Sequence, residues 1–220
     1  MPTTIAYLHT SHVLIPIFTE LSNRELPGAE QFHMVDESLI RNTIRAGKLT
    51  KGTIRRVIQL IQSAREGGAD GVMVTCSSIG PAAKLARELF DFPVVRVDEP
   101  MAEEAVRLGR RIGVAATLGT TLEPTVALLR AKALEAGRDV DVVESLCENA
   151  FEAVLCGDTG THDRLLADSL GRLMAAVDVV VLAQASMARV VAALPDDGGT
   201  PILSSPEMAV RRARSMLFPE

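Results

Sequence analysis

The sequence repeats itself at a spacing of about 108 residues, and this repeat constrains the fold more than any other feature. Four residues of the first half recur at that spacing: Pro16 as Pro124, Asp70 as Asp178, Ser78 as Ser186 and Pro93 as Pro201. One residue out of step, Glu37-Ser38-Leu39 matches Glu144-Ser145-Leu146, and Asn42 matches Asn149. The series keeps its register over about a hundred residues, so it predicts two copies of one fold in a single chain.

Short β-branched runs alternate with helical patterns in both halves, which indicates βα units and parallel sheets. The expected strands are 5–8, 71–75, 93–97, 112–116, 178–182 and 201–203. Amphipathic spacing predicts one helix through Ile54 and Ile61 that ends at Gly67-Gly68, and another through Leu166 and Leu173 after Thr161. We therefore expect an α/β protein with two pseudo-symmetric, flavodoxin-like halves, each a four-stranded parallel sheet flanked by helices.

The expected boundary between the halves follows from the same pattern. The first half is predicted to span residues 1–97 and the second residues 98–205. The last helix, 206–220, is expected to pack back on the first half, with Arg211-Arg212-Ala213-Arg214 on a solvated face.

Composition narrows the class of protein. A chain of 220 residues with 47% apolar residues can bury a substantial core without metals or disulfides, and three irregularly spaced cysteines favour neither a disulfide framework nor a zinc site. The N-terminus has no signal-like segment and no run approaches a membrane span, so we expect a soluble, cytoplasmic protein. A net charge of −5 without a basic run argues against nucleic acid. The expected partner is a small molecule, with no cofactor, metal or membrane.

Small polar residues gather where the first and third strands of each half end. In a flavodoxin-like sheet these carboxyl ends carry the reactive groups. The four turns are 9–11 and 75–78 in the first half, and 117–121 and 183–186 in the second.

Cys76 is the most informative residue of these turns. It lies between a strand and a helix that starts at Gly80-Pro81, so its thiol is expected to face helix-terminal N–H groups. That position lowers the pKa of a thiol, and the same N–H groups with the hydroxyls of Ser77 and Ser78 can hold a carboxylate. The alternative is that Cys76 is a small buried residue at the end of a strand.

Three of these turns carry a family resemblance. Residues 74–80, Val-Thr-Cys-Ser-Ser-Ile-Gly, resemble the first cysteine motif of the aspartate/glutamate/hydantoin racemase superfamily. Residues 181–188, Val-Leu-Ala-Gln-Ala-Ser-Met-Ala, resemble its second motif, and 115–121 resemble the loop that opens its second half. The resemblance spans essentially the whole chain and implies a cofactor-independent racemase or isomerase that binds a small carboxylate, such as an amino acid or a hydantoin, in a cleft between the halves. It also implies a homo-oligomer.

The resemblance assigns roles to individual residues. Cys76 and Gln184 are the implied catalytic positions. The implied substrate-binding residues are Thr10, Ser11, Ser77, Ser78, Thr117, Thr120, Thr121, Ala185 and Ser186. Helix capping is the alternative role for the hydroxyl residues, Thr121 before 122–124 in particular.

The second motif departs from the family pattern because Gln184 replaces the second cysteine. An amide cannot act as a thiol acid or base, although it donates and accepts hydrogen bonds. Three mechanisms stay open: racemisation with His9, His12 or water replacing the second thiol, one-sided proton transfer as in the family's decarboxylases, and addition of Cys76 to an alkene as in maleate cis-trans isomerases. A carboxylate-binding protein without turnover is the fourth reading.

The remaining polar residues have less positional support. His9 is the best candidate for an auxiliary base because it ends the first strand. His12, His33 and His162 are weaker candidates. Cys147 and Cys156 are expected to be buried, and Asp36-Glu37 is expected in a solvated turn.

Overall fold

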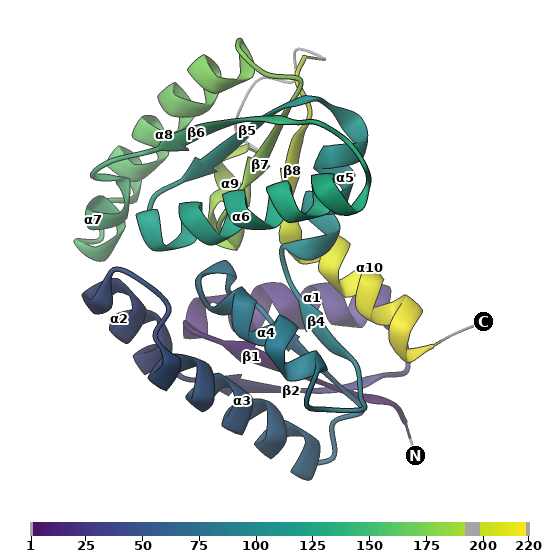
Figure 1. Cartoon of the computed structure of the whole chain (residues 1–220). Coiled ribbons are helices and arrows are strands. Elements are labelled where there is room, and N and C mark those ends of the chain that lie inside the picture. Colours follow the sequence, from purple (N-terminus) through teal and green to yellow (C-terminus); the bar gives the residue numbers. More distant parts are fainter. Residues whose placement is uncertain (1, 192–198, 219–220) are drawn as a thin grey trace. The chain divides into compact units, whose positions relative to one another are not determined.

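The computed structural model describes residues 2–191 and 199–218 and divides into two compact units (Figure 1). The first half comprises Met1–Pro100 and Pro206–Glu220, and the second comprises Met101–Ser205. Each half contains one four-stranded parallel sheet flanked by helices, which confirms the predicted fold class.

The first half is built on strands in the order β2-β1-β3-β4. Its elements in chain order are β1 (Thr4–His9), the 3₁₀ helix η1 (His12–Leu14), α1 (Ile15–Glu25), β2 (Glu30–Val35), α2 (Glu37–Ala46), α3 (Lys51–Glu66), β3 (Gly71–Val74), η2 (Ser77–Ile79), α4 (Gly80–Arg87), β4 (Val94–Arg96) and α10 (Ser205–Leu217). Helix α3 ends at Gly67, as its sequence pattern predicts.

The second half repeats this plan with strands in the order β6-β5-β7-β8. Its elements are α5 (Glu99–Leu108), β5 (Arg111–Ala116), α6 (Gly119–Glu135), β6 (Asp141–Leu146), α7 (Ala150–Leu155), α8 (Thr159–Met174), β7 (Val179–Leu182), η3 (Ala185–Met187), α9 (Ala188–Val191) and β8 (Ile202–Ser204).

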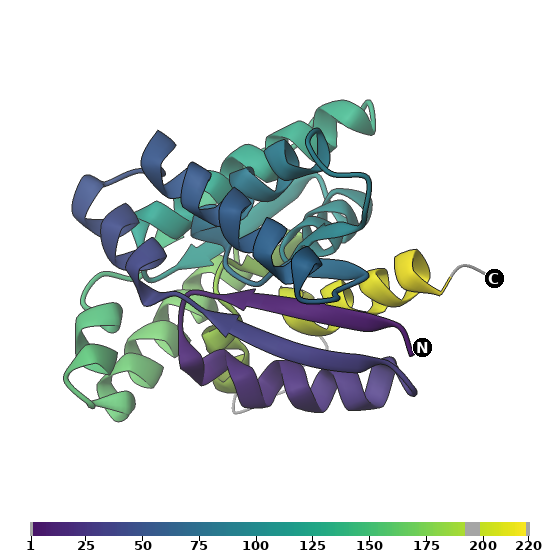
Figure 2. The same ribbon diagram turned by 90° about the horizontal axis from the view of Figure 1, so that it is seen from below.

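Side chains alternate between the two faces of each sheet. In the first half, Leu8 and Val74 pack with α2, α3 and α4, whereas Tyr7 points to the other face and contacts Phe18 of α1. Figures 1 and 2 show α1 on one side of this sheet and α3 and α4 on the other. In the second half, Ala115 and Leu182 pack with α7, α8 and α9. The first sheet is therefore covered on two faces, which suits its β-branched strands.

Helix α10 returns to the first half. Its Ala209, Val210 and Ala213 are fully buried. Arg211 lies 3.2 Å from Glu25 at the end of α1. The predicted solvated face is exposed at Arg211 and Arg214, while Ala213 between them faces the core.

The structure confirms the repeat just before the third strand of each half, but the match proposed near the second strands is wrong. Asp70 Oδ2 accepts the N–H of Thr4 at 2.9 Å, and its counterpart Asp178 accepts the N–H groups of Arg110 and Arg111 at 2.9 and 2.8 Å. The match of 37–39 with 144–146 is wrong, because the former starts α2 and the latter ends β6.

The prediction of a solvated turn at Asp36-Glu37 is also wrong. Asp36 is the N-cap of α2, where its carboxylate accepts the N–H of Ser38 at 2.9 Å and pairs with Arg56. Glu37 is the first residue of the helix. Aspartate is a favoured N-cap because its side chain satisfies an N–H group that the helix leaves unpaired.

Candidate active site

The Cys76 thiol lies at the carboxyl end of β3, surrounded by hydrogen-bond donors. Cys76 is the N-cap of η2, and α4 follows with a proline in its first turn. The hydroxyls of Thr10 and Ser78 and the backbone N–H groups of Ser78 and Ile79 hydrogen-bond the sulfur. The strand-turn-helix geometry predicted for this residue is therefore present.

The expected lowering of the Cys76 pKa is not observed. The residue is half-buried overall, but burial of the thiol raises its pKa and outweighs the four hydrogen bonds, each of which lowers it. Near neutral pH the thiol is consequently protonated. It is placed to give a proton away, and the four donors then stabilise the thiolate that remains.

Gln184 occupies the corresponding position after β7 and binds the neighbouring turn. Its Oε1 accepts the backbone N–H of Thr117 at 2.8 Å, and its Nε2 donates to Thr117 Oγ1 at 2.7 Å. These two bonds, which we call the Gln184 clamp, leave one N–H and one lone pair of the amide for other partners. The side chain thus orients Thr117, which the sequence alone did not indicate.

The two halves place equivalent residues in equivalent contacts. Thr10 and Thr117 follow the first strands of their sheets, and Cys76 and Gln184 follow the third strands. In each half the two turns are joined by a hydrogen bond, from Thr10 to the thiol in one and through the Gln184 clamp in the other. The second half therefore has the same connection with an amide in place of the thiol.

The other predicted substrate-binding residues lie in these same turns. Ser77 is buried beside Ser78, while Ser11 is half-buried and makes no capping bond with its side chain. Ala185 is half-buried at the start of η3. Ser186 lies in η3, but its side chain falls outside the described part of the structure.

Two of the predicted substrate-binding threonines lie in the first turn of α6. Thr121 is not the N-cap, because the helix starts at Gly119 after Leu118, and it is buried in the first turn. The buried Oγ1 of Thr120 has no hydrogen-bond partner among the described residues. A buried hydroxyl without a partner is uncommon in folded proteins, which makes Thr120 a candidate ligand contact.

The structure argues against His9 as an auxiliary base. The side chain is fully buried, with Nδ1 2.8 Å from Thr75 Oγ1 and Nε2 2.8 Å from His33 Nδ1. Burial, followed by the neighbouring His33, lowers the pKa of His9 to about 4. Both ring nitrogens are engaged, so neither is available to a substrate.

The comparisons with known proteins bear directly on this site. The model of the Asp/Glu/Hydantoin racemase family matches residues 9–213, which include all four turns. The chain belongs to the Asp/Glu/Hydantoin racemase family. Membership supports an enzyme of the racemase or isomerase type. A search of curated protein sequences finds no significant match.

Solved structures of racemases share the fold of this family member. Glutamate racemase from Francisella tularensis superposes with a TM-score of 0.76 at 15% identity, covering 99% of this chain and 81% of that one. Aspartate racemase from Picrophilus torridus gives 0.73 at 12% identity, covering 97% and 93%. Allantoin racemase from Klebsiella pneumoniae gives 0.71 at 18% identity, covering 97% and 86%.

His12, His162, Cys147 and Cys156 lie apart from the hydrogen bonds of the Cys76 thiol. His12 is exposed and lies 3.0 Å from Glu37, while His162 is buried with Nδ1 2.7 Å from Asp163. Cys147 is buried as predicted, and burial raises its pKa. Cys156 is exposed, so the prediction that it is buried is wrong.

A buried ion pair beside the Cys76 turn was missed by sequence reasoning. Arg96 at the end of β4 donates from Nε to Asp98 Oδ1 at 2.6 Å and from Nη2 to Oδ2 at 2.9 Å. Both residues are buried, and the guanidinium packs against Gly80 at the start of α4. The available signal was an arginine and an aspartate inside the apolar run 94–98.

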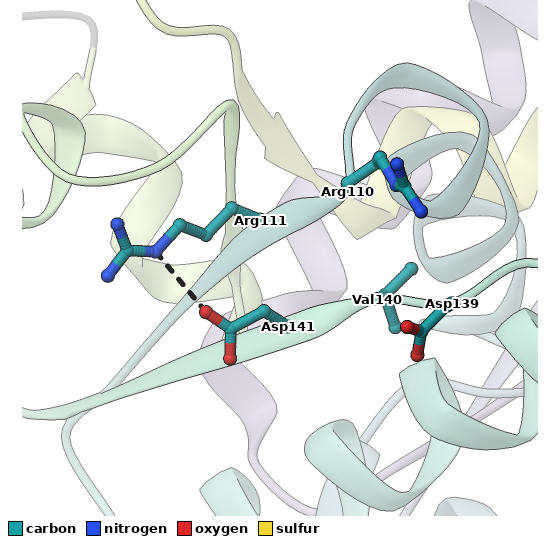
Figure 3. Close-up of a pocket in the computed structure, with 5 residues that line it drawn as sticks. All are labelled: Arg110, Arg111, Asp139, Val140 and Asp141. Atoms are coloured by element: carbon teal, nitrogen blue, oxygen red, sulfur yellow. Dashed lines mark ion pairs between the residues drawn. The ribbon is translucent and has the colours of Figure 1, made fainter.

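The surface pocket in Figure 3 lies at the opposite end of its sheet from the turns described above. Arg110, Arg111, Asp139, Val140 and Asp141 line it, and Arg111 pairs with Asp141 at 3.3 Å. A second pocket, lined by Thr3, Asp70 and Pro93 among others, occupies the corresponding end of the first sheet. Both lie at the amino ends of the strands, whereas ligands of such sheets bind at the carboxyl ends.

Two further observations concern the described residues as a whole. Within residues 2–191 and 199–218, no group of three or more histidine, cysteine or acidic side chains is arranged to hold a metal ion. None of the helices in that part of the chain is both long and apolar enough to cross a membrane.

Proposed function

We propose that this racemase family member is a cofactor-independent racemase or isomerase of a small carboxylate, with Cys76 as the group that transfers the proton. The observation that carries the proposal is the thiol at the end of β3, held by the hydroxyls of Thr10 and Ser78 and by two N–H groups. Family membership supports the class of reaction.

The environment of Cys76 supports a specific direction of proton flow. Because burial raises the pKa of the thiol, the resting enzyme holds the proton on sulfur. The thiol donates that proton to a carbanion or enediolate carbon, which forms when the substrate loses CO₂ or when a bound water removes its α-proton. The thiolate that remains keeps its four hydrogen bonds. Removal of a proton by Cys76 in the reverse direction requires that binding of the substrate favours the thiolate.

Names of the related structures support the substrate class. They are racemases of glutamate, aspartate and allantoin, the first two of which are amino acids with an extra carboxylate. The hydroxyl of Ser77, in the same turn as Cys76, is a suitable donor for a carboxylate. We propose an amino acid or a related small acid as the substrate.

The Gln184 clamp favours a second candidate, in which proton transfer occurs on one face only. A two-base racemase needs an acid or base on each side of the α-carbon, and the counterpart of Cys76 is an amide already bound to Thr117. In this reading the enzyme is a single-cysteine isomerase or decarboxylase.

Proton NMR in D₂O separates these candidates. The panel contains amino acids, hydantoins, 2-aryl acids and unsaturated diacids, with Cys76→Ala and Cys76→Ser as controls. Cysteine-dependent α-deuteration with inversion supports the racemase. Deuteration with retention, loss of CO₂ or alkene isomerisation supports the single-cysteine enzyme. If the panel is inert although a panel compound protects Cys76 from alkylation, the proposal is rejected in favour of a non-catalytic carboxylate-binding protein.

A further inference from the structure

Four side chains form a continuous hydrogen-bonded chain on the α1 face of the first sheet. Thr75 Oγ1 lies 2.8 Å from His9 Nδ1, His9 Nε2 lies 2.8 Å from His33 Nδ1, and His33 Nε2 lies 3.0 Å from Thr19 Oγ1. The two imidazoles stack with ring centroids 5.1 Å apart, and Tyr7 stacks on both. We call this set the His9 chain.

The direction of each hydrogen bond follows from one hydroxyl proton. Thr75 Oγ1 donates its proton to the carbonyl of Leu8 at 3.0 Å, so it must accept from the Nδ1–H of His9. In neutral His9, Nε2 is then an acceptor and takes the Nδ1–H of His33. The Nε2 of His33 is left to accept from the hydroxyl of Thr19. Both histidines, when neutral, therefore carry their proton on Nδ1.

The His9 chain lies one residue before the contacts of the reactive thiol. His9 precedes Thr10, and Thr75 precedes Cys76. The bond between His9 and Thr75 joins the ends of β1 and β3 on one face of the sheet, and the bond between Thr10 and Cys76 joins the next residues on the other face. A shift of either strand end would change both bonds together.

The second half provides an internal comparison. There the residues equivalent to His9 and Thr75 are Ala116 and Ala183, which carry no polar side chain. The following residues are joined by the two bonds of the Gln184 clamp, without a polar pair one residue before them. The buried polar chain thus accompanies the half that carries the thiol.

We propose that His9 is a positioning residue that acts through Thr75 to hold the hydrogen bond between Thr10 and Cys76. His33 fixes the tautomer in which His9 donates to Thr75. The inference rests on the proposed function of Cys76 in proton transfer, and it adds the group that keeps the thiol's main side-chain donor in place.

The test is alkylation of Cys76 by iodoacetamide as a function of pH, followed by peptide mass spectrometry. Thr75→Val keeps the shape and removes the hydroxyl. It is expected to slow alkylation near neutral pH by about twofold to tenfold and to move the profile to higher pH, because the Thr10 bond that favours the thiolate is weakened. Thr75→Ser keeps the hydroxyl and is expected to restore the wild-type profile.

A double variant and a distant control separate positioning from general destabilisation. In a Thr10→Val background, Thr75→Val is expected to have no further effect, because the bond through which it acts is already gone. Ser169→Ala removes a buried hydroxyl of the second half, 2.8 Å from Ser145, and is expected to leave the profile unchanged. A wild-type profile for folded Thr75→Val, or full additivity with Thr10→Val, overturns the proposal.

Two further measurements decide the matter if Thr75→Val does not fold. His9→Asn keeps a donor near the position of Nδ1 and is expected to retain the profile, whereas His9→Leu is expected to shift it. Equal profiles for these two variants contradict the inference. In the wild-type protein, ¹⁵N NMR is expected to show both His9 and His33 as Nδ1–H tautomers, and an Nε2–H tautomer at His9 contradicts it. Alkylation needs no substrate, so an inert substrate panel rejects the proposed function without deciding this test.

Discussion

Gly80 has no Cβ, and this allows Arg96 to pack closely against the helix that follows the Cys76 turn. The residue starts α4, four positions after Cys76, and a Cβ at this position would lie 2.5 Å from Arg96 Nε and 2.9 Å from Arg96 Cζ. Its φ of −51° is helical, so the backbone itself would accept any residue. Glycine is needed here for the close approach of the guanidinium.

Gly80→Ala is expected to destabilise the protein by about 1 to 3 kcal/mol, because the buried Arg96 must shift from its pair with Asp98. Gly171→Ala is the matched control. It lies inside α8, where a Cβ meets nothing within 4 Å, and should stabilise by about 0.5 to 1 kcal/mol. Urea unfolding of both variants gives the two values. Equal changes in stability for the two variants would show that Arg96 moves away from position 80 without a cost in free energy.

The buried pair of Arg96 and Asp98 predicts that loss of one charge destabilises the protein more than loss of both. Asp98→Leu leaves the guanidinium buried without its carboxylate, which costs about 3 to 5 kcal/mol. The double variant Arg96→Met with Asp98→Leu removes both charges and is expected to recover most of that loss. Thermal unfolding of the two variants tests this, and a double variant no more stable than Asp98→Leu would contradict it.

At the scale of the elements, the turns after the first and third strands are fastened to one another in both halves. The Gln184 clamp satisfies the N–H and the hydroxyl of Thr117 together. It therefore fixes the turn between β5 and α6, which has no side-chain cap at Leu118.

Gln184→Met, similar in length and volume, is expected to lower the free energy of unfolding by about 1 to 3 kcal/mol, because a largely buried N–H loses its partner. Gln184→Glu is the control, since a carboxylate can still accept both the N–H and the hydroxyl proton of Thr117. Chemical denaturation compares them. A loss in Gln184→Glu as large as that in Gln184→Met would exclude the clamp as the cause.

Many of the helices and strands were predictable from the sequence. The alternation of β-branched runs and helical patterns predicted the parallel sheets and the position of Cys76 between β3 and α4, because parallel sheets bury both faces and leave a clear pattern. The N-cap at Asp36 and the early start of α6 were not predicted. Short polar residues before helices are equally typical of turns, and only the tertiary packing decides between them.

The candidate site was predictable in its residues but less so in its energetics. The four turns, and the equivalent positions of Cys76 and Gln184 in the two halves, followed from the repeat and the family motifs. The pKa of Cys76 did not, because the pattern shows the N–H donors but not how deeply the thiol is buried. The partners of His9 and Gln184 lie 24 to 67 positions away, beyond what local spacing can indicate.

For the whole molecule, the buried histidines predict sensitivity to acid. The pKa of His9 is lowered from 6.5 to about 4, and burial also lowers that of His33. Between those two pH values the unfolded chain binds a proton at His9 that the folded chain excludes, so stability is complete above pH 6.5 and falls as the pH drops towards 4.

The expected loss from His9 over that range is on the order of 2 kcal/mol. Urea unfolding at pH 7.5 and pH 4.5 measures it, with His9→Asn as the comparison. The variant is expected to be less stable at pH 7.5 but to lose less between the two pH values. Parallel losses in the two proteins would show that His9 does not contribute to the acid sensitivity.

Because the two sheets share one architecture, each half serves as an internal reference for the other. Residues that match, such as Asp70 and Asp178, report what the duplicated backbone requires wherever it occurs. Residues that differ, such as His9 against Ala116 and Thr75 against Ala183, report what one copy acquired or the other lost after duplication. The differences between the halves can thus be tested within a single polypeptide, by transferring the differing residues from one half to the equivalent positions of the other.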